Sequence, residues 1–411
     1  MLFLYNILLI IASQIVKLLA FFSPKIKLFV DGRKTVFETL DNKINPEDKT
    51  IWFHAASLGE FEQGLPVMEK MKTKFPNHKI VVTFFSPSGY EVRKNNTIAD
   101  VTVYLPLDTK SNAKKFLKLV HPELVFFIKY EYWPNYLNEL KKANIKTYLI
   151  SGIFRENQAF FKWYGGFYRN ALKTFDYFFV QNENSKSLLQ RLGFNNVKIS
   201  GDTRFDRVVA ILERDNSLDF IKQFKNNTIT IVIGSSWPKD ENLIVNFINQ
   251  TNGSVKFIFA PHIIKPEQIQ ELKNSISKKT ILFSEKDNRD LSAFDVLIID
   301  AIGILTKVYS YADIAYVGGG FGTAGLHNIL EPATFGIPII IGPNFSNFAE
   351  AVALVHQTGC ISVANQDQLN DALSSLISNE DIRNEKGHIC STFVQMSKGA
   401  TDVILKHITI P

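Results

Sequence analysis

Short apolar runs alternate with longer helical segments through most of the chain. In the first half, the runs that we interpret as buried strands lie at residues 50–53, 79–84, 101–105, 124–128, 147–150 and 177–180. In the second half, comparable runs lie at residues 229–233, 255–260, 297–299, 314–317 and 337–341. Strands that alternate with helices indicate parallel sheets covered by helices. The pattern therefore predicts an α/β protein with two Rossmann-like, doubly wound domains.

The length of the chain and the positions of the two predicted sheets define the expected domains. A chain of 411 residues is too long for one ordinary hydrophobic core. We expect an N-terminal domain over residues 25–210, a linker over 211–228, a C-terminal domain over 229–395 and a last helix over 396–411. The default binding site of such a protein is a central cleft that its two domains face.

The first 24 residues are predicted to form a membrane anchor helix. Residues 2–22 are largely apolar and about as long as a bilayer crossing requires. The basic residues that follow closely are Lys25, Lys27, Arg33 and Lys34. By the positive-inside rule they place the downstream chain in the cytoplasm, and no basic segment precedes the run as in a cleaved signal peptide. Because Gln14 and Lys17 interrupt the run, a helix that lies in the membrane interface stays an alternative.

Composition and charge narrow the classes of partner. Hydrophobic residues make up 45% of the chain, the net charge is +6 and the pI is about 9.0. An excess of basic residues is typical of proteins that bind nucleic acid, an anionic membrane face or an anionic substrate. The basic residues are scattered and no nucleic-acid motif is present, which favours the latter two. The cysteines, Cys360 and Cys390, form no metal or redox motif, which fits a reducing cytoplasm.

A glycine-rich stretch follows the apolar run at 314–317. Its glycines are Gly318, Gly319, Gly320, Gly322 and Gly325. Glycines at this density let backbone N–H groups approach a ligand closely. We expect a helix to begin near residues 326–328 and to end near Gly336, so that its positive end faces a phosphate. Glu331, one turn into this helix, can then accept hydrogen bonds from ribose hydroxyls.

Several interpretations of this stretch compete. The pattern Gly320, Gly322, Gly325 matches the dinucleotide fingerprint, but the next predicted strand ends in Gly342 rather than in the acid that fingerprint needs. A P-loop is excluded, because no Gly-Lys-Ser/Thr follows the glycines. A nucleotide-sugar site accounts for all of these features, with the phosphate at the helix start and the ribose on Glu331. The remaining alternative is a glycine-rich βα turn that binds no ligand.

Carboxylates follow two of the predicted strands of the first half. Glu60 begins the helix after the strand at 50–53, where it either complements the helix dipole or acts as a general base. Composition alone favours the helix-dipole role. Glu131 follows the strand at 124–128 among aromatic residues, where we expect a cationic partner or a carboxyl held neutral. Because parallel strands end at one edge of their sheet, Glu60 and Glu131 should share that edge with Ser88 and Ser151.

Residues 154–169 mix aromatic rings with Arg155, Lys162 and Arg169. Aromatic rings between cations suit a lipid–water boundary or an anionic amphiphile. A partly buried helix with a solvated basic face is an equal alternative.

Four motifs make the chain resemble a known family. They are HAASLGE at 54–60, EYWPN at 131–135, GDTRFD at 201–206 and LHNILEPATFGIPIIIGPNFSNF at 326–348. In this order they resemble the 3-deoxy-D-manno-octulosonic acid (Kdo) transferases of lipopolysaccharide biosynthesis, which are GT-B glycosyltransferases. The resemblance implies transfer of Kdo from CMP-Kdo to a lipid A precursor (lipid IVA) at the cytoplasmic face of the cell inner membrane. It implies no cofactor besides the donor substrate, and a last helix that packs back on the first domain.

The resemblance also implies roles for particular residues. Glu60 falls on the catalytic base, and Glu131 and Arg204 fall on positions that stabilise the transition state. The donor contacts would be Pro261, His262, Ile302, Gly303, Ile304, Asn328, Ile329, Leu330 and Glu331. The chain departs from the family pattern at four positions: Arg204 replaces the usual Lys, Trp237 a His, His262 an Arg and Ile304 a Glu. These departures change the side chains that are expected to supply positive charge at the donor phosphate.

The implied reaction is an inverting transfer. Loss of CMP leaves an oxocarbenium-like sugar, Glu60 takes a proton from the attacking hydroxyl, and the helix start near Asn328, His262 and Arg204 stabilise the leaving phosphate. The chain contains no Asp-x-Asp triplet, so no metal is expected. Three alternatives stay open: a GT-B transferase that uses a UDP-sugar, an NAD-dependent dehydrogenase and a non-catalytic membrane-bound binding module.

Overall fold

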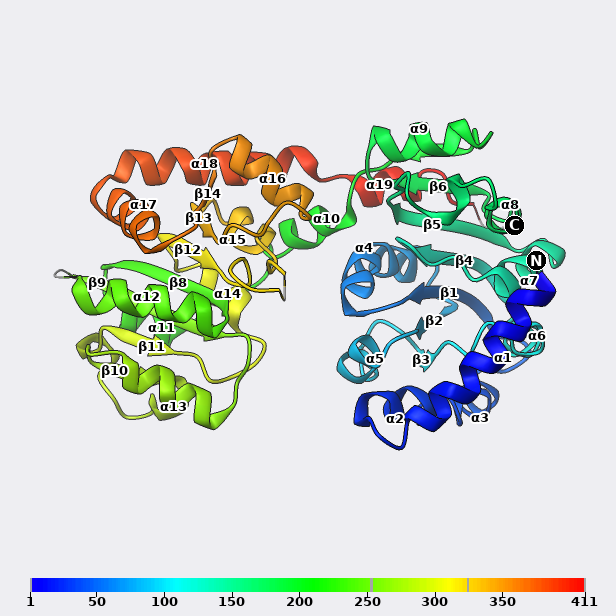
Figure 1. Ribbon diagram of the computed structural model, residues 1–411, viewed down its shortest axis with the longest axis horizontal. Helices are drawn as coiled ribbons and strands as arrows, with labels where there is room; N and C mark the ends of the chain where they lie inside the picture. Colours follow the sequence, from blue (N-terminus) through cyan, green and yellow to red (C-terminus); the bar gives the residue numbers. More distant parts are fainter. Residues whose placement is uncertain (1, 252–253, 324, 410–411) are drawn as a thin grey trace. The chain divides into compact units, whose positions relative to one another are not determined.

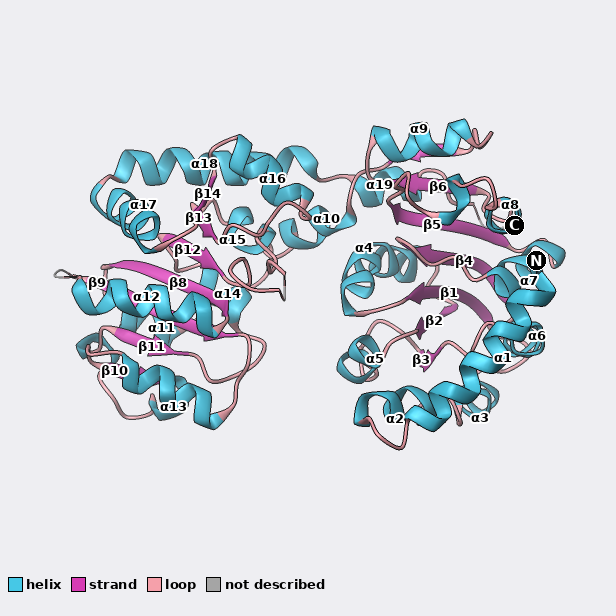
Figure 2. Cartoon of the chain, in the orientation of Figure 1, coloured by secondary structure: helices cyan, strands magenta, loops and turns pink. Residues whose placement is uncertain are grey.

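The computed structural model describes residues 2–251, 254–323 and 325–409, which divide into two compact units (Figure 1). The first unit comprises Met1–Arg207 and Lys398–Pro411, and the second comprises Val208–Ser397. Within the described residues, each unit is built on a seven-stranded parallel sheet flanked by helices (Figure 2). The two predicted doubly wound sheets are therefore confirmed.

The first sheet has the strand order β3-β2-β1-β4-β5-β6-β7. Its strands are β1 (Lys49–Ala55), β2 (His78–Phe84), β3 (Val101–Tyr104), β4 (Pro122–Ile128), β5 (Lys146–Gly152), β6 (Tyr177–Val180) and β7 (Val197–Ile199). The strand order reverses between the neighbouring strands β1 and β4, whose loops diverge to opposite faces of the sheet. Ligands of open α/β sheets bind at the carboxyl ends of the strands at such a switch point.

Helices cover both faces of the first sheet. They are α1 (Leu2–Leu19), α2 (Pro24–Asp31), α3 (Val36–Lys43), α4 (Leu58–Lys74), α5 (Pro87–Arg93), α6 (Lys110–Val120), α7 (Pro134–Lys142), α8 (Gly166–Leu172), α9 (Glu183–Arg191), α10 (Thr203–Val209) and α19 (Ala400–Leu405), with the 3-10 turn η1 (Ala159–Phe161). Alternate residues of β1 enter different cores: Trp52 packs on one face, and Ile51 and Phe53 pack on the other. Burial on both faces explains why the strands read as continuous apolar runs.

The second sheet has the strand order β10-β11-β9-β8-β12-β13-β14. Its strands are β8 (Ile229–Ser236), β9 (Val255–Pro261), β10 (Thr280–Leu282), β11 (Val296–Ile298), β12 (Ile314–Val317), β13 (Ile339–Ile341) and β14 (Cys360–Ser362). Its helices are α11 (Asp219–Lys225), α12 (Pro238–Gln250), α13 (Pro266–Ser275), α14 (Leu305–Tyr309), α15 (Leu330–Thr334), α16 (Ala349–His356), α17 (Gln366–Ser378) and α18 (Glu380–Ser397), with the 3-10 turns η2 (Phe283–Glu285) and η3 (Leu291–Ala293). Here the order reverses between β8 and β12, so the glycine-rich loop after β12 lies beside the end of β8.

The helix after the glycine-rich loop is shorter than predicted. It begins at Leu330 rather than near residues 326–328, and α15 has five residues. The Asn328 side chain accepts a hydrogen bond from the Leu330 N–H at 3.1 Å, which keeps residue 328 outside the helix. The predicted start of the helix is therefore wrong. The phosphate site at its N-terminus stays a prediction, and a helix of little more than one turn offers it only a weak dipole.

The segment expected to be a linker contains ordered structure. Within residues 211–228, helix α11 buries Ile221 and Phe224 in the core of the second unit. The division between the units falls earlier, between Arg207 and Val208 inside α10.

The last helix of the chain belongs to the first unit. Ile404 and Ile408 are buried in the core formed with β1, β2 and α4. Asp206 fixes the start of this segment, because its carboxylate accepts hydrogen bonds from the Gly399 and Thr401 N–H groups at 2.6 and 2.7 Å.

Helix α1 lies along the side of the first unit (Figure 1). It is long and apolar enough to span a membrane, as is also true of many N-terminal signal sequences. One polar stripe contacts the unit: the Tyr5 hydroxyl donates to the Asp108 carboxylate at 2.7 Å, and the Asn135 amide donates to Asn6 at 2.8 Å. The outward face is apolar and exposed, and comprises Phe3, Leu4, Ile7, Leu8, Ile10, Ile11, Ile15, Leu18 and Leu19. The helix is thus amphipathic.

Arg33, one of the basic residues that were predicted to flank the anchor, has a structural role. Its guanidinium donates to the backbone carbonyls of Phe29, Phe85 and Leu105 at 2.7–2.9 Å. Burial lowers its pKa to about 10. Arg33 therefore fastens α2 to the edge of the sheet and is not available to lipid headgroups.

Candidate active site

Glu60 lies beside the switch point of the first sheet. It stands in the first turn of α4, which begins at Leu58. The Ser57 hydroxyl donates a hydrogen bond to one Glu60 carboxylate oxygen. Glu60 is half-buried, so its carboxylate is held in place and still accessible. These are the features that a general base needs.

Glu131 follows β4 on the other side of the switch point. Its Oε2 accepts hydrogen bonds from His54 Nε2 at 3.0 Å and from Trp133 Nε1 at 2.8 Å. The Glu131 side chain is 11% exposed, and His54 is fully buried. The partners of this carboxylate are thus an imidazole and an indole. The loop leaves β4 through Lys129, whose φ of 69° is unusual for a residue with a side chain.

The phenol of Tyr130 interacts electrostatically with charged residues at this edge of the sheet. Burial raises the pKa of its phenol, and the Glu60 carboxylate raises it further, while Arg155 and Arg204 lower it. The Arg155 guanidinium lies 5.6 Å from the centre of the Tyr130 ring. Glu60 and Arg204, predicted as site residues from distant motifs, both act electrostatically on this phenol.

Arg204 is oriented by its own neighbour. Its Nε and Nη2 atoms lie 2.9 and 2.8 Å from Asp202 Oδ2, and Gln63 donates to Asp202 Oδ1 at 3.0 Å. About a third of the Arg204 side chain is exposed.

Sequence reasoning missed four residues at this edge: His54, Tyr130, Trp133 and Arg155. Three of them lie inside or beside the motifs that contain Glu60 and Glu131, so the motif spacing could have identified them. Arg155 lies in the aromatic and basic segment, for which the sequence offered only a membrane role or a solvated face.

In the second unit, a stack of three rings lies at the ends of β8, β9 and β12. The Trp237 and His262 rings are 4.7 Å apart and nearly parallel, and the His262 and His327 rings are 4.4 Å apart. Trp237 Nε1 donates to His327 Nε2 at 3.0 Å. His262 was a predicted donor contact; His327, in the LHN motif, was missed.

Both histidines of the stack favour the neutral form. Burial, and then the neighbouring His262, lower the pKa of His327 to about 4, and burial lowers the pKa of His262. At neutral pH, His262 therefore offers a phosphate a hydrogen bond rather than a positive charge.

Acidification is expected to destabilise the second unit through His327. Because its pKa falls from 6.5 to about 4 on folding, the unfolded chain binds a proton between these values that the folded unit does not. This contribution is complete above about pH 6.5 and falls by roughly 2–3 kcal/mol as the pH drops toward 4. Melting curves at neutral and acidic pH should show a smaller acid shift for His327→Gln. An equal acid shift in both proteins would contradict the expectation.

The glycine run packs against other backbone segments. A Cβ on Gly318 would lie 2.4 Å from the Ser235 carbonyl oxygen, and a Cβ on Gly320 would lie 2.7 Å from the Gly342 backbone. Gly319 has a φ of 95°, and its N–H donates to Asp240 at 3.0 Å. These three glycines are therefore needed for the close approach of neighbouring loops.

Asp240 holds the ends of β8 and β12 together. Its carboxylate is fully buried and accepts hydrogen bonds from the Trp237 N–H at 2.9 Å, the Gly319 N–H at 3.0 Å and the Tyr316 hydroxyl at 2.8 Å. A single buried carboxylate thus fixes both the ring stack and the glycine-rich loop.

Glu331 joins two of the predicted donor-binding segments. Its carboxylate accepts hydrogen bonds from Thr306 at 2.7 Å and from the Asn328 amide at 3.1 Å. Thr306 lies just after the loop 302–304, in which Ile302 is 91% exposed and Gly303 has a φ of 95°.

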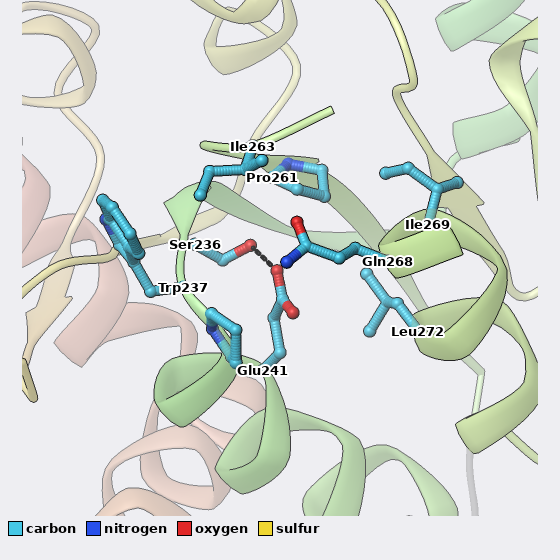
Figure 3. Close-up of a pocket in the computed structure, with 9 residues that line it drawn as sticks. Ser236, Trp237, Glu241, Pro261, Ile263, Gln268, Ile269 and Leu272 are labelled. Carbon is cyan, nitrogen blue, oxygen red and sulfur yellow. Dashed lines mark hydrogen bonds between the residues drawn. The ribbon is translucent and has the colours of Figure 1, made fainter. Parts of the chain in front are cut away.

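The remaining predicted donor residues differ in accessibility. The side chains of Ile329 and Leu330 are buried, so a contact with the donor would use their backbone. Pro261 ends β9 beside a small pocket, in which Ser236 donates to Glu241 at 2.8 Å (Figure 3). Burial raises the Glu241 pKa. The free volume of the pocket is about 20 Å³, which is enough for a water molecule and too small for a nucleotide.

The two Rossmann-like units with candidate residues at their switch points define a protein of the GT-B class. A solved structure supports this assignment: UDP-GlcNAc 2-epimerase from Neisseria meningitidis bound to UDP-GlcNAc has a TM-score of 0.61 and covers 87% of this chain and 98% of its own. It is 14% identical in sequence, so the likeness concerns the fold.

Sequence comparison identifies the family. The family described as 3-deoxy-D-manno-octulosonic-acid transferase (kdotransferase) matches residues 32–207. The 3-deoxy-D-manno-octulosonic acid transferase of Chlamydia trachomatis serovar D is 30% identical over 375 residues, which cover 87% of this chain and 86% of the relative. The transferase of the same name from Rickettsia bellii is 27% identical over 369 residues. The chain belongs to the Kdo transferase family of glycosyltransferases, as its motifs predicted.

Proposed function

We propose that the protein is an inverting glycosyltransferase that moves Kdo from CMP-Kdo to a lipid A precursor, lipid IVA, in lipopolysaccharide biosynthesis. Family membership supports the reaction class. The observation that carries the proposal is that Glu60 and Arg204 are connected at the switch point of the first sheet. Gln63, on the same helix as Glu60, donates to Asp202, which holds Arg204, and Glu131 follows the neighbouring strand β4. A base, an anionic stabiliser and a cation in one place match what this transfer needs.

In the proposed mechanism, Glu60 takes the proton from a sugar hydroxyl of the acceptor as that hydroxyl attacks the anomeric carbon of Kdo. The leaving CMP departs from the opposite face, so the configuration inverts. Glu131 places negative charge near the oxocarbenium-like sugar, and Arg204 offers N–H donors to the leaving phosphate. Ser57 and Asp202 keep Glu60 and Arg204 in position.

The second unit would bind the donor nucleotide at the carboxyl edge of its sheet. Glu331 and Asn328, already linked to one another, would hold the ribose, with Pro261 and the loop 302–304 beside the nucleotide. Because His262 favours the neutral form, we infer that the phosphate is bound mainly by hydrogen bonds in this unit. The positive charge would then come from Arg204. No metal is required, because a single phosphate leaves.

Helix α1 supports a location at the cytoplasmic face of the inner membrane. The stripe with Tyr5 and Asn6 is hydrogen-bonded to the first unit, while the opposite apolar stripe is exposed along the whole helix. We infer that α1 lies in the membrane interface with this stripe in the acyl region. The Tyr5 ring contacts Phe167 at 5.5 Å, and nearby Trp163 is 92% exposed, as is typical of an interfacial aromatic residue.

A depth measurement distinguishes an interfacial helix from a spanning one. Leu4→Cys and Leu18→Cys lie at opposite ends of the exposed stripe, and both native cysteines are buried, so a fluorophore can be attached selectively. Quenching by nitroxide lipids in anionic vesicles should place both labels at the same depth, about 5–10 Å below the headgroups. Val92→Cys, on exposed α5, should stay in water. With nitroxide lipids confined to the outer leaflet, quenching of one α1 label without the other would show a spanning helix.

The transfer itself is tested by incubating the full chain with CMP-Kdo and a tetra-acylated disaccharide bisphosphate, followed by mass spectrometry. A product heavier by one or more Kdo residues supports the proposal. Transfer from a UDP-sugar, with CMP failing to compete, would favour a different GT-B transferase. CMP binding without any product would indicate a binding module, and NAD binding would indicate a dehydrogenase.

A further inference from the structure

The start of helix α7 is capped by a residue from another part of the chain. The first N–H groups of a helix have no partner within the helix, and a side chain at the N-cap position usually accepts from them. In α7 this position holds Trp133, whose indole can only donate. The acceptor is Asp108, whose Oδ2 accepts from the Asn135 N–H at 3.1 Å and whose Oδ1 accepts from the Tyr136 N–H at 3.0 Å. Asp108 is 1% exposed, so these bonds are shielded from water.

Helix α1 completes this cap. The Tyr5 hydroxyl donates to the same Oδ2 atom of Asp108 at 2.7 Å. The Asn135 amide donates to Asn6 Oδ1 at 2.8 Å and also to the Asp108 backbone carbonyl. Two adjacent residues of the helix that carries the exposed apolar stripe therefore bond to the capping residue and to the residue that it caps.

The capped turn begins directly after the loop that contains Glu131. Trp133 Nε1 lies 2.8 Å from Glu131 Oε2, and the Trp133 ring packs on Phe85 with ring centres 4.7 Å apart. Pro134, the next residue, fixes the backbone at the first position of α7. A shift of the start of α7 would therefore move the indole and with it the carboxylate. A displacement of about 1 Å at a reacting group can lower a rate by about 10²-fold.

We infer that Tyr5 and Asn6 are positioning residues for the transfer, which act on Glu131 through Asp108 and the start of α7. The helix that meets the membrane is then part of the scaffold of the active site, in addition to attaching the protein. The inference rests on the proposed function, because it needs Glu131 to take part in Kdo transfer. The competing interpretation is that α1 attaches the protein to lipid through its apolar stripe and has no effect on Glu131.

Hydrogen–deuterium exchange of the full chain in detergent micelles tests the cap without any assay of activity. Tyr5→Phe keeps the ring and removes only the hydroxyl, whereas Ser13→Ala removes a hydroxyl that bonds within α1 itself, to the Ile10 carbonyl. Mass spectrometry of the peptide 131–140 should show exchange about 10-fold faster in Tyr5→Phe and unchanged in Ser13→Ala. Asn6→Ala removes the second contact and should also accelerate exchange. Unchanged exchange in both Tyr5→Phe and Asn6→Ala would overturn the inference.

Steady-state kinetics in the same micelles test whether the cap matters for the transfer. Detergent removes the need for membrane attachment, so a helix that serves only as an anchor would leave kcat unchanged in every variant. We expect Tyr5→Phe to lower kcat about 10-fold, with the KM for CMP-Kdo within about twofold, and Ser13→Ala to turn over normally. Faster exchange in Tyr5→Phe with a normal kcat would overturn the positioning role. Absence of Kdo transfer in the unchanged protein would overturn the proposed function and this role with it, whereas the exchange rates report the cap alone.

Discussion

Replacing Glu60 with glutamine is expected to lower kcat by about 10²–10⁴-fold, with the KM for CMP-Kdo within a few fold. Glutamine keeps the size of the side chain and can still accept a hydrogen bond from Ser57, but it cannot take a proton from the attacking hydroxyl. The donor nucleotide would be bound by the other unit, so its affinity should not depend on Glu60. Initial rates of Kdo transfer at several donor concentrations separate the two effects.

The matched control for this variant lies in the same helix. Glu69→Gln, at an exposed position of α4, removes an equal charge and should transfer Kdo at the normal rate. A Glu60→Gln enzyme that folds and turns over as fast as this control would show that another group takes the proton. The dipole role that composition favours for Glu60 would then suffice, since the loss of a charge at a helix start costs about 0.3–1 kcal/mol of stability and no activity.

Asp240→Ala is expected to destabilise the second unit by about 3–5 kcal/mol. The substitution leaves the Trp237 N–H, the Gly319 N–H and the Tyr316 hydroxyl without their acceptor in a fully buried site. It also releases the glycine-rich loop from the end of β8. Binding of CMP should therefore be lost together with stability, although Asp240 is not itself proposed to touch the nucleotide.

Asp240→Asn serves as the comparison, because it keeps one carbonyl oxygen in the same place and should cost roughly half as much. Denaturant unfolding, followed by the fluorescence of Trp237 and its fellow tryptophans, measures the loss of stability, and calorimetric titration with CMP measures binding. Wild-type stability of Asp240→Ala would mean that water replaces the carboxylate at this site.

The central strands of both sheets were predictable, because burial on both faces gives each of them a continuous apolar run. The edge strands β7, β10 and β14 were missed, because each has three residues of which one is polar, whereas the equally short β11 and β13 are entirely apolar. The start of α15 was also wrong. A local hydrogen bond of Asn328 and the φ of 91° at Gly325 decide that boundary, and the helical periodicity does not contain this information.

The candidate site was predictable where a residue belongs to a motif at the end of a strand, as for Glu60 and Glu131. What could not be predicted is how side chains from separate strands meet. His54 reaches Glu131 only because β1 and β4 are neighbours in the sheet. Arg33 is read as a membrane-flanking charge from its position in the chain, yet the folded protein uses its guanidinium to satisfy three carbonyls.

The place of α19 has a consequence for how the protein is made. Ile404 and Ile408 complete a core whose other members were synthesised several hundred residues earlier. The first unit therefore cannot finish folding until the second unit has been produced. A nascent chain stalled before these residues would expose an apolar face of the first sheet to chaperones.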